Sequence, residues 1–239
     1  MTDVRGMDAE QIERLDHPNL QGFLHRPSRP RGDGVVLAHG AGSSCQAPLL
    51  VSLASAFAQA GFAALRINLP FRRERPGGPP RPGDAARDRE GLYHAVQQLR
   101  AQGLAQVIVG GHSYGARQAT LLAAEDPYLA SRLLLLSYPL HPPRKPNQLR
   151  SLHFPQLKTP SLFVHGDRDP FATVEELRTA IETIPARTEV LVIPGAGHGL
   201  QALFRGRSSS LLPAMIDRLE GLSISSTAGA QQAASTLPS

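Results

Sequence analysis

The 239-residue chain is 41% hydrophobic and 19% charged, which fits one folded α/β domain and argues against a disordered protein. Its single cysteine, Cys45, excludes an intrachain disulfide, and no apolar run reaches the ~18 residues of a membrane-spanning helix. The net charge of +5 comes almost entirely from arginine, without the reading motif of a nucleic-acid-binding domain, and the polar first residues lack a secretory signal. We therefore expect a cytoplasmic protein that binds neither nucleic acid nor membrane.

Strand-like and helix-like patterns alternate along the chain, which is typical of a mostly parallel sheet with crossover helices. Local signals support some boundaries, since Gly61 follows the first helical pattern and Asp84 is a suitable N-cap. The predicted elements, in chain order, are strand 35–38, helix 48–59, strand 62–67, helix 84–102, strand 107–109, helix 116–125, strand 132–137, strand 162–164, helix 174–183, strand 190–193 and helix 208–219.

The remaining segments have the composition of loops or ends. Loop 68–83 is rich in Pro, Gly and Arg, and loop 139–160 contains several prolines; neither is long enough for a separate lid domain. Residues 1–33 are too few for two full strands, so we expect an N-terminal segment with at most one edge strand. The folded domain is predicted over 34–221, and the stretch 222–239, rich in Ser, Ala and Gln, as a flexible tail.

A serine between two glycines, Gly111-His112-Ser113-Tyr114-Gly115, lies between a β-branched run and a helical pattern. In a tight strand-to-helix turn the glycines allow close backbone approach, the serine hydroxyl is lifted clear of the sheet, and the first helical N–H groups face the reacting centre. The pentapeptide alone is a weak signal, but its position between strand and helix favours a nucleophile.

A serine nucleophile needs a base and an orienting acid, and the chain offers both beyond later strands. Asp169 and His198 follow predicted strands, which places them with Ser113 at the carboxyl edge of a parallel sheet. Asp167 competes for the acid role, but Asp169 precedes Pro170 and is better placed to turn toward the histidine. Asp167 is then left to cap or brace the loop.

The segment His39-Gly40-Ala41-Gly42 follows the first core strand, and its small residues allow backbone N–H groups to approach a substrate oxygen. We assign the N–H groups of Ala41 and Tyr114 to the oxyanion hole. Gly42 is either a third donor, and so a substrate-binding residue, or a turn residue only.

Together these motifs resemble those of the α/β-hydrolase superfamily, over roughly 35–219. The resemblance implies an α/β-hydrolase fold with a mostly parallel central sheet, helices on both faces and no separate lid domain. Segments 65–71, 115–117 and 138–143 further resemble the small dienelactone-hydrolase-like group. Dienelactone hydrolases proper use a cysteine nucleophile, whereas this chain has serine at the corresponding place.

Several basic residues have two interpretations. Arg72 and Arg73, in the arginine-rich stretch 72–89, either bind a carboxylate or phosphate of the substrate or belong to a solvated basic loop. Arg117 is expected to brace the turn after Ser113 through a buried ion pair. His39 is expected to support the loop that carries Ala41, and His112 the turn that carries Ser113.

The sequence thus predicts a serine hydrolase that cleaves a carboxylic ester or similar acyl bond of a small molecule through an acyl-enzyme. No cluster has metal-ligand spacing, so we expect neither metal nor cofactor. Two alternatives stay open: a non-catalytic interaction protein that kept the fold, and an acyltransferase that uses the same residues. The sequence determines neither the substrate nor the oligomeric state.

Overall fold

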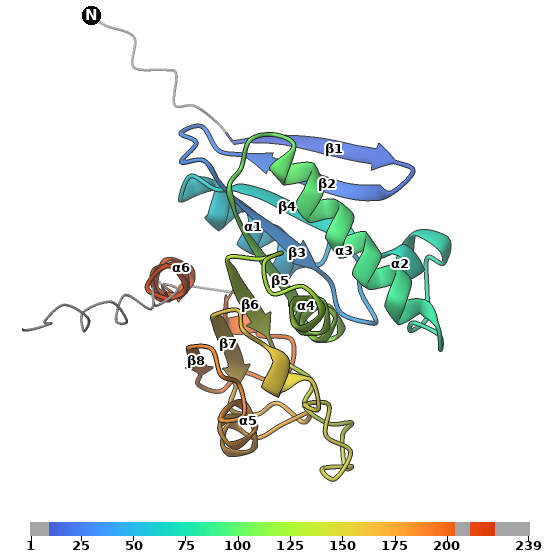
Figure 1. The fold of residues 1–239 in the computed structure, drawn as a ribbon, viewed down its shortest axis with the longest axis vertical. Coiled ribbons are helices and arrows are strands. Elements are labelled where there is room, and N and C mark those ends of the chain that lie inside the picture. Colours follow the sequence, from blue (N-terminus) through green and yellow to red (C-terminus); the bar gives the residue numbers. More distant parts are fainter. Residues whose placement is uncertain (1–9, 204–210, 223–239) are drawn as a thin grey trace, which may run out of the picture.

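The computed structural model describes residues 10–203 and 211–222, and these form a single eight-stranded sheet. The order of its strands is β1-β2-β4-β3-β5-β6-β7-β8 (Figure 1). Their bounds are β1 Gln11–His17, β2 Leu20–Arg26, β3 Asp33–Ala38, β4 Ala63–Asn68, β5 Gln106–His112, β6 Arg132–Leu136, β7 Ser161–Gly166 and β8 Thr188–Ile193.

Six neighbouring strands run parallel to one another: β4, β3, β5, β6, β7 and β8. Strand β2 pairs antiparallel with both β1 and β4. Parallel neighbours end at the same edge of a sheet, so the loops after β3, β5, β7 and β8 all leave from its carboxyl edge. This is the edge at which the sequence places its candidate catalytic residues.

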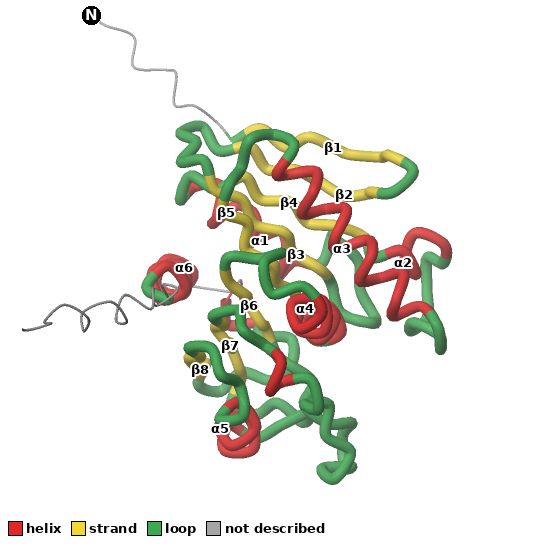
Figure 2. Tube along the Cα trace, viewed as in Figure 1, coloured by secondary structure: helices red, strands yellow, loops and turns green. Residues whose placement is uncertain are grey.

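Helices cover both faces of the strand layer (Figure 2). Because side chains alternate along a strand, Val36 and Ala38 point into one core, while Val35 and Leu37 point into the other. Helices α3, α4 and α5 pack on the first core, and α1 and α6 on the second. The helix bounds are α1 Pro48–Gln59, α2 Pro70–Glu74, α3 Asp84–Arg100, α4 Tyr114–Glu125, α5 Val174–Ile181 and α6 Leu211–Glu220, with short 3₁₀ turns η1 Phe154–Gln156 and η2 Gln201–Leu203.

The N-terminal segment contains two strands, so the expectation of at most one is wrong. The β1–β2 connection consists only of Pro18 and Asn19, and this two-residue turn lets 16 residues, Gln11 to Arg26, form a complete hairpin. Strand β1 is an edge strand in which only Leu15 is buried, so its polar sequence gave little sign of a strand.

The two predicted loops contain short helices and no lid. Helix α2 has five residues within 68–83, and η1 has three within 139–160, so the described connections carry no separate lid domain. No helix among the described residues is long and apolar enough to cross a bilayer. The predicted tail lies, apart from the buried Leu222, outside the described residues.

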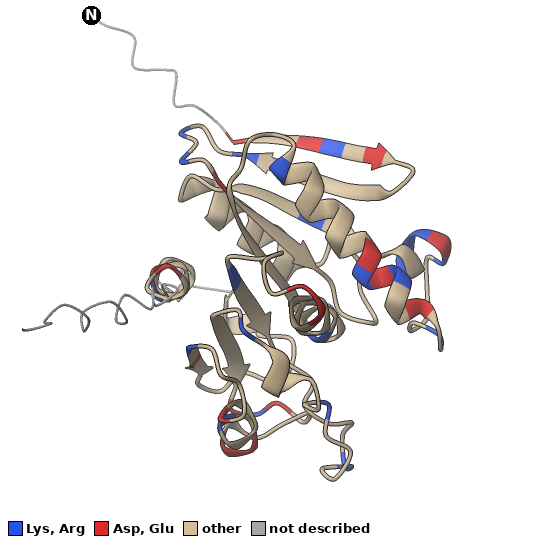
Figure 3. Ribbon diagram, in the orientation of Figure 1, with Lys and Arg blue, Asp and Glu red and all other residues tan. Residues whose placement is uncertain are grey.

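Positively and negatively charged residues lie next to one another where the arginine-rich stretch meets α3 (Figure 3). Arg87 pairs with both Glu74 and Asp84, and Asp84 also pairs with Arg75. Much of the positive charge of this stretch is therefore compensated locally.

Candidate active site

Ser113 lies in a strained turn between β5 and α4. Its backbone φ is 53°, a left-handed value that non-glycine residues seldom adopt and that often marks functional sites. A Cβ on Gly111 would lie 2.7 Å from the carbonyl carbon of Gly115, and a Cβ on Gly115 would lie 2.6 Å from the Ala38 carbonyl oxygen. Positions 111 and 115 must therefore be glycine for β5, α4 and the end of β3 to meet this closely.

The structure brings the three predicted catalytic residues together. The Ser113 hydroxyl donates to Nε2 of His198 at 2.8 Å. On the other side of the ring, Nδ1–H of His198 donates to the Asp169 carboxylate, at 2.8 Å to Oδ2 and 3.0 Å to Oδ1. The imidazole thus bridges a hydroxyl and a carboxylate that come from loops after different strands, which is the geometry of an activated nucleophile.

The Asp169 side chain is fully buried, and its surroundings keep it ionised. Burial alone would raise the pKa of this carboxyl, but the hydrogen bond and charge of His198, together with the Phe171 N–H, outweigh burial and lower the pKa. A carboxylate that stays negative can hold the histidine in one tautomer and stabilise its protonated form.

Asp167 has a different role. Its Oδ1 accepts the N–H of Gly195 at 2.7 Å, which ties the loop after β7 to the loop that carries His198. It is exposed, whereas Asp169 faces the histidine, so the two aspartates divide between bracing and orienting as the sequence suggests.

The loop after β3, residues 39–43, lies against Ser113; it is called the oxyanion loop here after its predicted role. A Cβ on Gly40 would be 3.5 Å from Cβ of Ser113, and a larger residue would crowd this approach. His39 fixes the loop, because its Nε2 accepts the N–H of Leu69 at 3.1 Å and its Nδ1–H donates to the Gly40 carbonyl at 2.8 Å. Burial lowers the pKa of His39 to about 4, so the ring is neutral at physiological pH, as this bonding pattern requires.

The two assigned donors come from either side of this contact. Ala41 follows Gly40 on the oxyanion loop, and Tyr114 begins α4, where the first N–H groups of a helix have no partner within it. Gly42 is exposed at the tip, where an added Cβ would meet no atom within 4 Å. Its backbone lies in a turn.

His198 is held from two further directions. Nε2–H of His112 donates to the His198 carbonyl at 2.7 Å, and burial lowers the pKa of His112 to about 4, which keeps it a neutral donor. The Phe171 ring lies over the imidazole, with centroids 4.2 Å apart and planes inclined by 30°.

A family model described as an alpha/beta hydrolase domain matches residues 31–218 of this chain. The chain belongs to the α/β-hydrolase family. The match covers the strands and loops that carry Ser113, Asp169 and His198, and it confirms the fold expected from the sequence motifs.

Relatives of this α/β-hydrolase place it near the dienelactone hydrolases. A "Putative carboxymethylenebutenolidase" of Escherichia coli is 29% identical over 108 residues, which is 42% of this chain and 38% of that protein, so the match spans well under half of the relative's length. A "Putative protein-lysine deacylase ABHD14B" of Pongo abelii is 26% identical over 90% of this chain and 100% of that protein. The crystal structure of a dienelactone hydrolase from Anabaena variabilis superposes with a TM-score of 0.67 at 24% identity, over 89% of this chain and 96% of that one.

Arg72 supports the oxyanion loop, so it neither binds substrate nor belongs to a solvated loop, the two roles expected from the sequence. Its buried guanidinium donates to the carbonyls of Ser43 and Ala41, both at 2.8 Å, and also to those of Gly78 at 2.9 Å and Arg75 at 3.2 Å. The guanidinium therefore joins α2 and its following turn to the oxyanion loop.

Arg73, for which the sequence left substrate binding and a solvated loop open, points to the N-terminal hairpin. It donates to the carbonyls of His17 at 3.2 Å and Pro18 at 2.6 Å. It thus holds the β1–β2 turn against α2.

Sequence reasoning missed Asp88, a buried acid beneath the serine turn. It accepts the Tyr114 hydroxyl at 2.7 Å and the N–H of Phe71 at 3.0 Å, so it links α3 to both α4 and α2. Burial is the main reason that its pKa is raised. A signal was available, because Asp88 lies four residues before Leu92 on the apolar stripe of α3, where an acid needs a partner.

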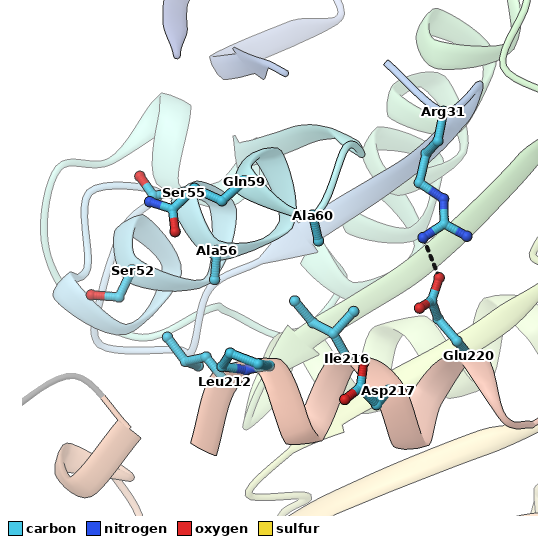
Figure 4. Close-up of a pocket in the computed structure, with 11 residues that line it drawn as sticks. Arg31, Ser52, Ser55, Ala56, Gln59, Ala60, Leu212, Ile216, Asp217 and Glu220 are labelled. Carbon is cyan, nitrogen blue, oxygen red and sulfur yellow. Dashed lines mark ion pairs between the residues drawn. The ribbon is translucent and has the colours of Figure 1, made fainter. Parts of the chain in front are cut away.

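A surface hollow between α1 and α6 is separate from this site (Figure 4). Ser52, Ala56 and Ile216 line it, and the Arg31–Glu220 ion pair closes one end. Arg31 precedes β3, so the hollow extends toward the amino edge of the sheet, and it contains none of the three catalytic candidates.

Proposed function

We propose that this protein is a serine hydrolase that cleaves a carboxylic ester or similar acyl bond through an acyl-enzyme. The observation that carries the proposal is the position of the His198 ring, with Nε2 at 2.8 Å from Ser113 Oγ and Nδ1 at 2.8 Å from Asp169. These distances allow proton transfer from the hydroxyl without a large rearrangement.

The proposed reaction has two stages. Ser113 Oγ attacks the carbonyl carbon while His198 takes its proton, and the N–H groups of Ala41 and Tyr114 stabilise the oxyanion. His198 then gives the proton to the leaving group, which departs and leaves the acyl group on Ser113. Water, activated by His198, attacks the acyl-enzyme and releases the acid. Throughout, Asp169 stays ionised and fixes the ring.

The comparisons support a hydrolase more firmly than any substrate. A further structural neighbour, from Coxiella burnetii, is described as an alpha-beta serine hydrolase homologue. The curated relatives are named as a butenolidase and as a lysine deacylase, and these names give different substrates. Because no lid covers the described part of the site, we propose a small ester-like molecule as substrate.

Labelling with a fluorophosphonate probe tests the nucleophile. The wild type should be labelled on Ser113 and should hydrolyse a short-chain 4-nitrophenyl ester, whereas Ser113→Ala should do neither, with a loss of kcat on the order of a thousandfold or more. Ser131→Ala is a matched control, since the Ser131 hydroxyl is buried without a hydrogen-bond partner at the amino end of β6. A folded wild type that takes no label would contradict the proposal.

The same measurement separates the alternatives. A non-catalytic interaction protein would give no turnover of the ester in either form. An acyltransferase would also be labelled by the probe. It would turn over the ester faster when an alcohol or amine acceptor is added to the water. The intact serine–histidine–aspartate arrangement favours catalysis over a purely structural role.

A further inference from the structure

Asp88 is a buried carboxylate that the proposed reaction does not use. It lies on α3 and has no exposed surface. Its neighbour Asp84, one turn earlier on the helix, has arginine partners, whereas Asp88 forms no ion pair among the described residues. A buried carboxylate without a cation is unfavourable unless its oxygens accept hydrogen bonds. The bonds that Asp88 accepts therefore indicate its role.

Each oxygen of this carboxylate accepts a hydrogen bond from a different helix. Oδ2 accepts the Tyr114 hydroxyl at 2.7 Å, and Oδ1 accepts the N–H of Phe71 at 3.0 Å. Burial, and after it the bond to Asp88, raises the pKa of Tyr114, so its hydroxyl keeps the proton that it donates. Asp88 thus ties the first residue of α4 and the second residue of α2 to α3.

The bond from Tyr114 fixes one of the two proposed oxyanion donors, because the backbone N–H of the same residue is that donor. The Tyr114 ring also packs edge-on against Phe71, with centroids 5.7 Å apart. A rotation of Tyr114 that moved its N–H would therefore break the bond to Asp88. This bond takes the place of the expected ion pair of Arg117, whose Nε is buried without a hydrogen-bond partner and which pairs with no acid among the described residues.

The bond from Phe71 fixes the other donor through α2. The next residue, Arg72, donates to the carbonyl of Ala41 at 2.8 Å. On its other side, the Phe71 ring packs against His39, with centroids 5.5 Å apart, and His39 donates to the Gly40 carbonyl at 2.8 Å. The position of α2 therefore determines the position of the oxyanion loop, which carries the second proposed donor, the Ala41 N–H.

Helix α3 provides a rigid base for these contacts. It has 17 residues, and its apolar stripe is fully buried in the core. Gly91 lies on the same face as Asp88, and a Cβ added to it would be 2.6 Å from Cδ of Pro70. The absence of a side chain at Gly91 lets the start of α2 pack directly on α3, where the Phe71 N–H reaches Asp88.

We propose that Asp88 is a positioning residue that sets the spacing of the two oxyanion donors, the N–H groups of Ala41 and Tyr114. It does not touch the substrate, and it acts through α2 and through the Tyr114 side chain. Such donors stabilise a transition state when they already point to the place where the oxyanion forms, so a change in their spacing lowers the rate. This inference rests on the proposed hydrolase function.

Two esters that differ in a single atom test the role. The first is 4-nitrophenyl acetate, and the second is its thiono analogue, in which sulfur replaces the carbonyl oxygen. Sulfur is larger and a weaker hydrogen-bond acceptor, so the thiono ester gains little from the two N–H donors. The wild type should therefore show a higher kcat/KM for the oxygen ester. Asp88→Ala should reduce this oxygen-to-sulfur ratio about tenfold or more, because it releases both donors.

Two further variants separate the positioning of the donors from folding. Tyr114→Phe removes only the bond from α4, so it should lower the ratio about threefold or more. Asp88→Asn should retain most of the ratio, since its amide oxygen can accept the Phe71 N–H while its amide nitrogen donates to the Tyr114 hydroxyl oxygen. If Asp88→Ala does not fold, these two variants still test the proposal, and a ratio in Tyr114→Phe equal to that of the wild type overturns it.

Asp84→Ala is the matched control. It removes another buried carboxylate from α3, one whose bonds go to Arg75, Arg81 and Arg87 and to neither Tyr114 nor Phe71. It should lower the free energy of unfolding in urea and leave the ratio unchanged. A smaller folded fraction lowers the rates of both esters by the same factor. The proposal is therefore overturned if Asp88→Ala lowers both equally, or if Asp84→Ala reduces the ratio as much as Asp88→Ala does.

Labelling distinguishes a failure of this inference from a failure of the hydrolase proposal. A folded wild type that takes no fluorophosphonate on Ser113 and hydrolyses neither ester contradicts the hydrolase proposal itself. A wild type that is labelled but does not prefer the oxygen ester overturns the oxyanion hole and, with it, the role of Asp88. If the labelled wild type prefers the oxygen ester and folded Asp88→Ala keeps the same preference, only the role of Asp88 is overturned.

Discussion

Two aspartates follow β7, and because they have different hydrogen-bond partners we expect them to affect kcat differently. Asp169 receives Nδ1–H of His198, whereas Asp167 receives the N–H of Gly195. A neutral amide at 169 would turn one of its N–H groups toward the ring and favour the wrong histidine tautomer. We therefore expect Asp169→Asn to lower kcat by on the order of a thousandfold or more, measured with a 4-nitrophenyl ester.

Asp167→Asn is the matched control for this change. Its side-chain oxygen can still accept the Gly195 N–H, so kcat should stay within about tenfold of the wild type, the loss expected from one weakened hydrogen bond. Equal losses for the two substitutions would show that the loop as a whole, rather than the carboxylate of Asp169, determines activity.

At the scale of elements, the oxyanion loop depends on the five-residue helix α2. Arg72 on this helix supplies donors to four carbonyls, two of which, those of Ala41 and Ser43, belong to the oxyanion loop. Because these carbonyls would be left unpaired, Arg72→Met should lower the free energy of unfolding by about 2–4 kcal/mol and should reduce kcat, measured by urea denaturation and ester turnover.

The adjacent arginine provides the comparison. Among the described residues, the half-buried Arg73 donates to the carbonyls of His17 and Pro18 at the β1–β2 turn and to none on the oxyanion loop, so Arg73→Met should lower the free energy of unfolding by less than about 1 kcal/mol. If Arg73→Met proved as destabilising as Arg72→Met, the helix rather than its bonds to the oxyanion loop would be the stabilising feature.

Buried elements could be predicted because burial leaves a sequence signature. The strand with Leu133 to Leu136 is entirely apolar, and Ser113 lies between two glycines that the close approach of β3 demands. The exposed strand β1 and the short helix α2 lack such a signature. Long-range contacts left little trace either: nothing near Arg72 in the sequence indicates that its partners lie on the oxyanion loop, about 30 residues earlier.

For the whole molecule, the buried histidines couple folding to pH. Burial lowers the pKa values of His39, His112 and His153 to about 4, and it also lowers that of His25. In the unfolded chain a histidine has a pKa of about 6.5. Between these values the unfolded state binds protons that the folded state does not.

Stability should therefore be complete above about pH 6.5 and should fall as the pH is lowered toward 4, by up to ~1.4 kcal/mol per pH unit for each buried histidine. The carboxylates with lowered pKa values, Asp84, Asp169 and Glu176, add their losses only below about pH 4.5, and the raised pKa of the buried Asp88 acts in the opposite direction, so a loss of stability between pH 6.5 and 5 comes from the histidines. Urea denaturation at several pH values measures the slope, and His153→Gln should make it shallower by one histidine's share. A free energy of unfolding that stays constant from pH 7 to 5 would contradict this prediction, because these rings would then take up protons in the folded protein as readily as in the unfolded chain. For His39 this would break the hydrogen bond in which its Nε2 accepts the N–H of Leu69.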